Sequence, residues 1–259
     1  MQIEVEERVK NLDKTQMTSI FLKEINNFFS SLIGSVSMIV FLIITSVLLW
    51  LIPSYSVLNY GFATLEGFFS LAPILFLIII PAITMRLIAE EKNLGTLEIL
   101  FTKPISDFQI IIGKYLAALL LCVLSLVPTI IYYYSIYQLG YPKGNIDTGG
   151  VIGSYIGLFF LSSAFTAIGM FCSSVTHNQI IAFIFAVMFC SFLYWGFDLF
   201  SGFEFMEGQI EIFIKNLGIA AHYESISKGV IDSRDVLYFL SIDAIFILLS
   251  LTVLESRKW

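Results

Sequence analysis

The chain has 259 residues, of which 58% are hydrophobic and 13% are charged, and its mean hydropathy is +0.88. Soluble domains carry about 25% charged residues, so this composition excludes an ordinary soluble domain and predicts an integral membrane protein. The net charge of −6 says little, because the distribution of charges matters more in a membrane protein than their sum. Long continuous apolar runs predict an all-α protein with helical spans.

The chain begins with a polar stretch followed by an amphipathic one. Residues 1–16 predict a loosely ordered cytosolic tail, and their acidic start does not resemble a cleavable signal peptide. Residues 17–31 carry apolar side chains at helical spacing, with Glu24 and other polar side chains elsewhere on the helix, which predicts a helix lying along the membrane surface. The alternative is that these residues extend the first span.

Six apolar runs long enough to cross a membrane follow. They cover about residues 32–52, 69–84, 109–137, 151–172, 179–198 and 236–254. Residues 140–149 predict a turn-rich loop between the third and fourth spans. Residues 200–235 are expected to form short helices that cap the outer surface or dock a partner. We expect residues 17–255 to form a single transmembrane domain.

Lys and Arg are distributed unevenly over this topology. With six spans both termini share a side, and that side carries most of the 14 basic residues, namely Arg8, Lys10, Lys14, Lys23, Arg86, Lys92, Lys103, Lys114, Arg257 and Lys258. The other side carries Lys143, Lys215, Lys228 and Arg234. Because basic residues favour the cytoplasmic side, we expect a multi-pass protein with both termini in the cytoplasm.

The motifs of several enzyme classes are missing from the sequence. There is no HExxH zinc motif, no GxSxG elbow and no Walker A loop, since Gly113-Lys114 lacks the glycine-rich residues that precede it in such a loop. We therefore expect no enzyme, no cofactor and no metal in this chain. Cys122, Cys172 and Cys190 lie in apolar runs and are expected to pack as small apolar residues.

Asp243 is a carboxyl inside the last predicted span. It lies about seven residues from the outer end of that span, which is roughly 10 Å at ~1.5 Å per residue. Intramembrane carboxyls are costly and are therefore candidates for function, so Asp243 is a possible intramembrane polar site. The alternatives are a hydrogen bond to another helix and protonation.

Residues 86–104 form a charged segment between the second and third spans. Gly95 allows a tight turn, residues 96–100 predict a short helix, and Pro104 disfavours its continuation. Ser106 and Gln109 then match a capping box, with which the third span begins. A short lateral helix under a bundle can act as a lever that a partner moves. The alternative is an ordinary, well-capped loop.

This segment resembles the signature of ABC-2 type transporter permeases. The matching pattern is Glu91, then Gly95-Thr96-Leu97-Glu98, then Pro104 and Gly113-Lys114, and the resemblance covers about residues 17–255. Within the family the chain is most similar to the gliding-motility-associated permeases of the GldF type. That closer similarity rests on residues 58–63, 221–232 and 234–235.

The resemblance implies a permease of the type V exporter-like form, with six transmembrane helices and residues 17–31 as an N-terminal elbow helix. It implies that residues 85–108 are a cytoplasmic coupling segment, in which residues 91–104 dock on a separate ATPase subunit that binds ATP and Mg²⁺. The coupling positions would be Glu91, Gly95, Thr96, Glu98 and Pro104. It further implies a second permease bundle in a homodimer, an auxiliary membrane subunit similar to GldG, the inner membrane, and a link to gliding motility and type IX secretion. No nucleic acid partner is expected.

Three functions remain open from the sequence. The first is a permease driven by a partner ATPase. The second is a structural membrane subunit whose partner ATPase drives an extracellular apparatus, with no translocated solute. The third, a stand-alone secondary transporter, is disfavoured because the chain shows no repeated halves and no ion-coupling set in its spans.

Overall fold

The computed structural model describes residues 2–53, 56–59, 61–102, 104–202 and 208–256. No strand occurs in these ranges, which confirms the all-α prediction. In chain order the helices are α1 (Gln2–Ser30), α2 (Leu32–Trp50), η1 (Val57–Asn59), α3 (Glu66–Thr84), α4 (Ala89–Asn93), α5 (Thr96–Phe101), α6 (Asp107–Leu126), η2 (Val127–Thr129), α7 (Ile130–Leu139), α8 (Thr148–Val175), α9 (Gln179–Ser191), the π-helix η3 (Phe192–Gly196), α10 (Phe197–Ser201), α11 (Gln209–Lys215), α12 (Ile219–Ser227) and α13 (Ser233–Glu255).

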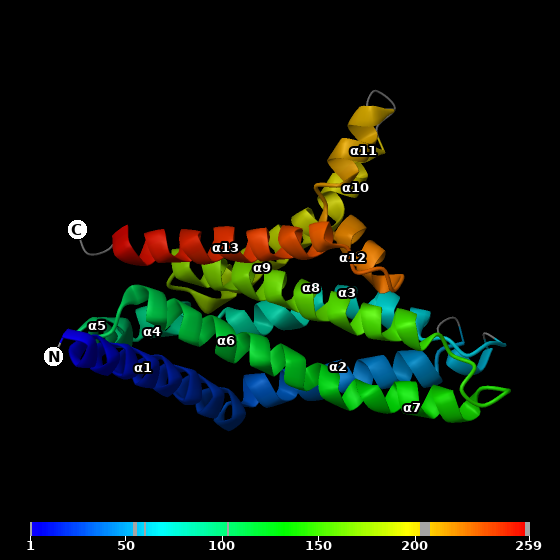
Figure 1. The fold of residues 1–259 in the computed structure, drawn as a ribbon, viewed down its shortest axis with the longest axis horizontal. Helices are drawn as coiled ribbons and strands as arrows, with labels where there is room; N and C mark the ends of the chain where they lie inside the picture. Colours follow the sequence, from blue (N-terminus) through cyan, green and yellow to red (C-terminus); the bar gives the residue numbers. More distant parts are fainter. Residues whose placement is uncertain (1, 54–55, 60, 103, 203–207, 257–259) are drawn as a thin grey trace.

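Long apolar helices dominate the fold and lie roughly along a common axis (Figure 1). Five helical stretches in the described ranges are long and apolar enough to cross a membrane: Glu66–Asn93, Asp107–Leu139, Thr148–Val175, Gln179–Ser201 and Ser233–Glu255. A sixth candidate combines Gln16–Ser30 with Gly34–Trp50, which are bent by 64° at the break between them. The prediction of a multi-pass helical membrane protein is therefore confirmed, and the six-span count holds when this bent pair is one span.

α8 is the central helix, because α3, α6, α9, α12 and α13 all pack against it. Small residues allow the close contacts. A Cβ atom on Gly169 would lie 2.1 Å from Thr84 Oγ1 of α3, and one on Gly153 would lie 2.7 Å from the Gly229 Cα that follows α12. Small residues in membrane helices let backbones approach and gain van der Waals contact. α8 thus forms the core on which its neighbours are placed.

α1 and α2 meet at a sharp bend. The Ser31 hydroxyl accepts the N–H of Gly34 and so caps α2. A Cβ atom on Gly34 would lie 2.6 Å from the Phe28 carbonyl oxygen, so the close approach at this bend favours glycine. Ile20, Glu24 and Phe28 are buried on one face of α1, which packs along α6. The boundary between the amphipathic helix and the first span falls where the sequence predicts it.

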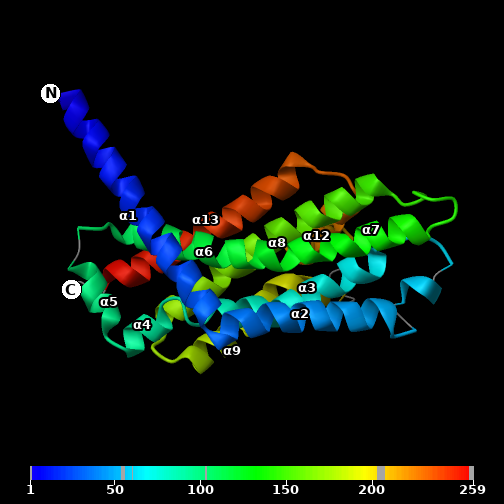
Figure 2. The same ribbon diagram turned by 90° about the horizontal axis from the view of Figure 1, so that it is seen from below.

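Residues 2–16 are helical, so the prediction of a loosely ordered tail was wrong. α1 runs from Gln2 to Ser30, and Figure 2 shows its first half projecting past the bundle. The stretch contains neither Gly nor Pro and is rich in good helix formers. Continuing an existing helix adds one hydrogen bond per residue, so the part held against α6 extends towards the N-terminus. The cytosolic location stays a prediction.

At the other end of the bundle the structure contains the predicted loop and the predicted short helices. Residues 140–147 are irregular, and Asp147 caps α8 by accepting the N–H of Gly150 at 3.1 Å. Between α9 and α13 the described chain forms the short helices α10, α11 and α12. α12 packs on α8 and α13, whereas α11 projects away from the bundle (Figure 1). Residues 203–207 lie outside the described ranges.

Candidate functional site

The charged segment between α3 and α6 folds as the sequence predicts. α4 is followed by Gly95 with a φ of 70°, in the left-handed region that favours glycine, and then by α5. Ser106 caps α6, because its hydroxyl accepts the Gln109 N–H at 3.3 Å while the Gln109 side chain accepts the Ser106 N–H at 3.1 Å. α5 is the predicted lateral helix.

This segment lies at one end of the molecule. α4 and α5 lie at the end of the bundle where α13 ends, whereas the loop of residues 140–147 lies at the opposite end (Figures 1 and 2). The charged segment therefore shares an end of the bundle with the C-terminal end of α13.

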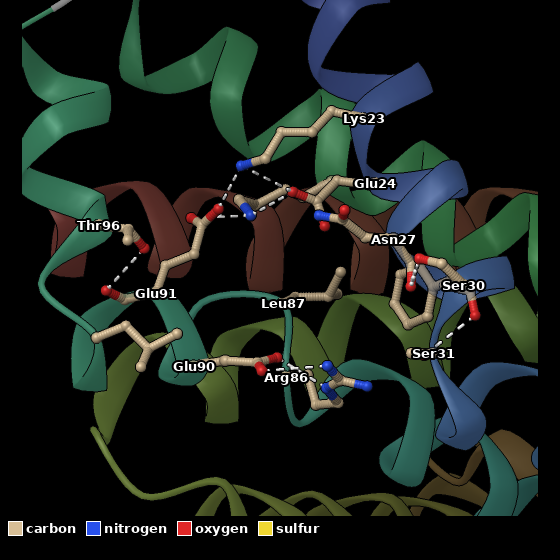
Figure 3. A pocket seen from close by; sticks show the side chains of 13 residues that line it. Lys23, Glu24, Asn27, Ser30, Ser31, Arg86, Leu87, Glu90, Glu91 and Thr96 are labelled. Carbon is tan, nitrogen blue, oxygen red and sulfur yellow. Dashed lines mark hydrogen bonds and ion pairs between the residues drawn. The ribbon is translucent and has the colours of Figure 1, made fainter.

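Four charged side chains join α1, α4 and α6 beneath the segment. This charge cluster consists of Lys23, Glu24, Glu91 and Lys114. Lys114 Nζ lies 2.8 Å from Glu24 Oε1 and 2.9 Å from Glu91 Oε2, and Lys23 Nζ lies 2.9 Å from Glu91 Oε1. Figure 3 shows Lys23, Glu24 and Glu91 converging between the helices.

The charge cluster is buried unevenly. The Lys114 side chain is 1% exposed and that of Glu91 is 14% exposed, whereas that of Lys23 is 50% exposed. A buried ion costs several kcal/mol unless opposite charges and hydrogen bonds compensate it. Two carboxylates around Lys114, balanced by the second cation of Lys23, make the group neutral as a whole. The charge cluster is therefore stable as a unit and joins three helices that are distant in sequence.

A cavity of about 440 Å³ lies beside the charge cluster, between α1, the end of α3 and α4. Its wall also carries Arg86 and Glu90, which form a two-pronged pair with distances of 2.7 and 3.1 Å (Figure 3). The charges on this wall thus pair with one another. α1 and α4 make few other contacts with each other in the described chain, so the charge cluster is the main connection between these two helices.

α4 is also fastened to the end of α8. The Ser173 hydroxyl oxygen accepts the N–H groups of Ile88 and Ala89 at 3.1 and 3.0 Å, and Lys92 Nζ donates to the Ser174 carbonyl. α4 has no side-chain cap of its own, and the first N–H groups of a helix need partners from outside it. Ser173 supplies those partners, so α4 is held by α8 as well as by α1 and α6.

The structure separates the predicted coupling residues into two groups. Glu91 points into the charge cluster and away from the surface. Gly95, Thr96, Glu98 and Pro104 are exposed, and Thr96 also lines the cavity beside the charge cluster.

Sequence analysis overlooked two exposed apolar residues in this segment. Leu94 is 66% exposed and Ile99 is 62% exposed. Large apolar side chains in a charged segment outside the spans are a signal for a contact surface. We call the exposed surface the α4–α5 face, and it comprises Asn93, Leu94, Gly95, Thr96, Glu98, Ile99 and Thr102.

The sequence pattern did not identify Lys23, Glu24 and Lys114 as members of a charge cluster. The available signal was Lys114, a lone charge within an apolar run, which calls for an opposite charge from another helix. The periodicity of residues 17–31 placed Glu24 on the polar side, whereas the structure buries it against Lys114.

Asp243 forms a separate polar site. It is buried in α13 and accepts a hydrogen bond from the Ser163 hydroxyl of α8. The Tyr115 hydroxyl of α6 lies 2.6 Å from Ser163 Oγ. A hydrogen bond to another helix, one of the predicted alternatives, is therefore present.

A family model described as "ABC-2 family transporter protein" matches residues 54–219, which is more than half of the chain. The matched range includes the α4–α5 face and Glu91, whereas Lys23, Glu24 and Asp243 lie outside it. No curated protein matches the chain.

Proposed function

The chain belongs to the ABC-2 family of transporter proteins, and from this premise we propose that it is the permease subunit of an ABC transporter, coupled to a separate ATPase. The single observation that carries the proposal is the α4–α5 face. It is an exposed patch with apolar centres at Leu94 and Ile99, on a segment that is fastened to several spans. A face of that kind suits a partner that pushes on the bundle.

Movement of this face would reach the bundle by two routes. The charge cluster connects α4 to α1 and α6 through Glu91 and Lys114. Ser173 connects the start of α4 to α8, the central helix. In this account ATP and Mg²⁺ bind to the partner, and the chain contributes docking and transmission rather than catalysis.

The resemblance at Glu91, Gly95, Thr96, Glu98 and Pro104 supports the finer parts of the proposal. In this account the permease lies in the inner membrane with both termini in the cytoplasm, and it pairs with a second copy of itself. Similarity to the gliding-motility-associated permeases supports a role in gliding motility and type IX secretion, with an auxiliary subunit of the GldG kind. A structural subunit that drives an external apparatus without moving a solute is the alternative, and it predicts the same docking.

The proposal is tested by charge reversal on the face. We expect Glu98→Arg to abolish co-purification of the ATPase and to reduce ATP turnover by the complex at least tenfold, with the fold unchanged. Glu224→Arg is the matched control, because Glu224 is also exposed but lies on α12. If Glu98→Arg retains normal ATPase binding and turnover, docking at this face is wrong.

Gly95→Trp tests the same face in a second way, because it adds bulk at a position with φ of 70° that L side chains rarely adopt. We expect the same loss of ATPase binding. A transport assay on the intact complex then separates a permease from a structural subunit, since only the permease moves a solute.

A further inference from the structure

Asp243 is a buried carboxyl that the proposed function does not use. It lies about ten residues into α13, roughly 15 Å from the start of that helix at ~1.5 Å per residue. Its partner Ser163 lies about 15 residues into α8, near the middle of that helix. Because α8 and α13 are both long enough to span a membrane, the site lies within the hydrocarbon region.

Polar groups from three helices form a chain at this site. The Ser163 hydroxyl donates to Asp243 Oδ2. The Tyr115 hydroxyl lies 2.6 Å from Ser163 Oγ. Hydrogen bonds therefore join Tyr115 of α6, Ser163 of α8 and Asp243 of α13.

An ionised Asp243 would have hydrogen bonds from hydroxyls but no cation to compensate its charge. Its Oδ1 atom is buried and has no hydrogen-bond partner among the residues that the structure describes. No ion pair of Asp243 occurs within those residues, and Lys114, next to Tyr115 in the sequence, pairs with Glu24 and Glu91 instead.

The other charged groups near α13 lie elsewhere. His222 of α12 contacts the first turn of α13, where its Nδ1 atom lies 2.7 Å from Asp235 Oδ1. The described residues also contain no group of three or more His, Cys, Asp or Glu side chains that would hold a metal ion. The groups that face Asp243 are therefore the neutral hydroxyls of Ser163 and Tyr115.

An isolated carboxylate in a low-dielectric interior is so costly that the group takes up a proton instead. We infer that Asp243 is a proton-binding site inside the membrane domain, protonated in this conformation. This inference does not depend on ATPase docking.

Infrared spectroscopy of the purified chain in lipid nanodiscs near neutral pH tests the inference. We expect a carbonyl band of a protonated carboxyl that shifts in D₂O and disappears in Asp243→Asn. Asp147→Asn is the matched control, because Asp147 is an exposed helix cap, and it should leave the band unchanged. Identical bands in wild type and Asp243→Asn would overturn the inference.

A chemical test works on the wild-type chain even if Asp243→Asn fails to fold. Dicyclohexylcarbodiimide reacts with a protonated carboxyl: the acid proton moves to one carbodiimide nitrogen and the carboxyl oxygen adds to the central carbon. The acyl group then migrates to nitrogen, giving an N-acylurea with no atom lost. Peptide mapping should find this adduct on Asp243, and a water-soluble carbodiimide should not produce it. Recovery of Asp243 unmodified by both reagents would contradict the proton site.

Discussion

At the scale of single residues, Tyr223 repairs a gap in the backbone hydrogen bonding of α3. In a regular helix the Phe69 carbonyl would accept the N–H of residue 73, but Pro73 has no N–H to donate. The Tyr223 hydroxyl of α12 donates to the Phe69 carbonyl at 2.7 Å instead. Tyr223 is buried, so water does not reach the Phe69 carbonyl, and the Tyr223 hydroxyl supplies the hydrogen bond that Pro73 cannot. It also fixes α12 to the start of α3.

Tyr223→Phe removes that donor and leaves the Phe69 carbonyl unpaired in a buried position. We expect a loss of about 1–3 kcal/mol of stability, the cost of an unsatisfied buried acceptor. Thermal unfolding of the chain in detergent measures the effect. Tyr141→Phe is the control, because Tyr141 is fully solvent-facing in the loop at the same end. Equal unfolding temperatures for Tyr223→Phe and wild type would refute this role.

At the scale of elements, the charge cluster is a joint between α1, α4 and α6. Each helix contributes at least one charge, and Lys114 at the centre pairs with carboxylates from both of the others. Ser173 joins α4 to α8 by an independent set of bonds. α4 is thus a five-residue helix held from two sides, which suits an element that passes motion from a partner to several spans.

Lys114→Met removes the central cation and leaves Glu24 and Glu91 facing each other in a largely buried site. We expect a destabilisation of about 3–5 kcal/mol, as is usual when one partner of a buried charge pair is lost. The further changes Glu24→Gln and Glu91→Gln should restore most of the stability, because no buried charge is then left unpaired. Unfolding midpoints in detergent measure both effects, with Lys143→Met in the exposed loop as control.

A result in which Lys114→Met and Lys143→Met unfold at the same temperature would show that the charge cluster contributes nothing to the fold. Failure of the triple variant to recover stability would show that Lys114 acts through its packing rather than its charge.

At the scale of the whole molecule, the parts that could be predicted from the sequence are those set by neighbouring residues. Gly95 predicts its turn and Ser106 its capping box, because each depends on bonds within a few residues. Apolar runs likewise predict the spans, since length and composition decide whether a helix can cross a membrane. The position of the lateral helix followed from the same local signals.

The charge cluster could not be predicted in this way. Lys23 and Glu91 are separated by 68 positions in the chain, and Glu24 and Lys114 by 90. Whether such pairs form depends on how α1 packs along α6. The periodicity of residues 17–31 also placed Glu24 on the polar side, because the pattern within one helix carries no information about Lys114, which is buried in the facing helix α6. The inward direction of Glu91 follows from the same packing, and so the division between Glu91 and the exposed Glu98 emerged only from the fold.

Coupling of this permease to its ATPase depends on docking of the ATPase at the α4–α5 face. Site-specific photo-crosslinking in the native membrane tests it most directly, with p-benzoyl-phenylalanine placed at Ile99 on the face and, in a separate variant, at Tyr141 in the loop at the opposite end. Docking at the α4–α5 face predicts a crosslink from position 99 to a nucleotide-binding subunit and none from position 141. A crosslink to that subunit from position 141, or none from position 99, would contradict it.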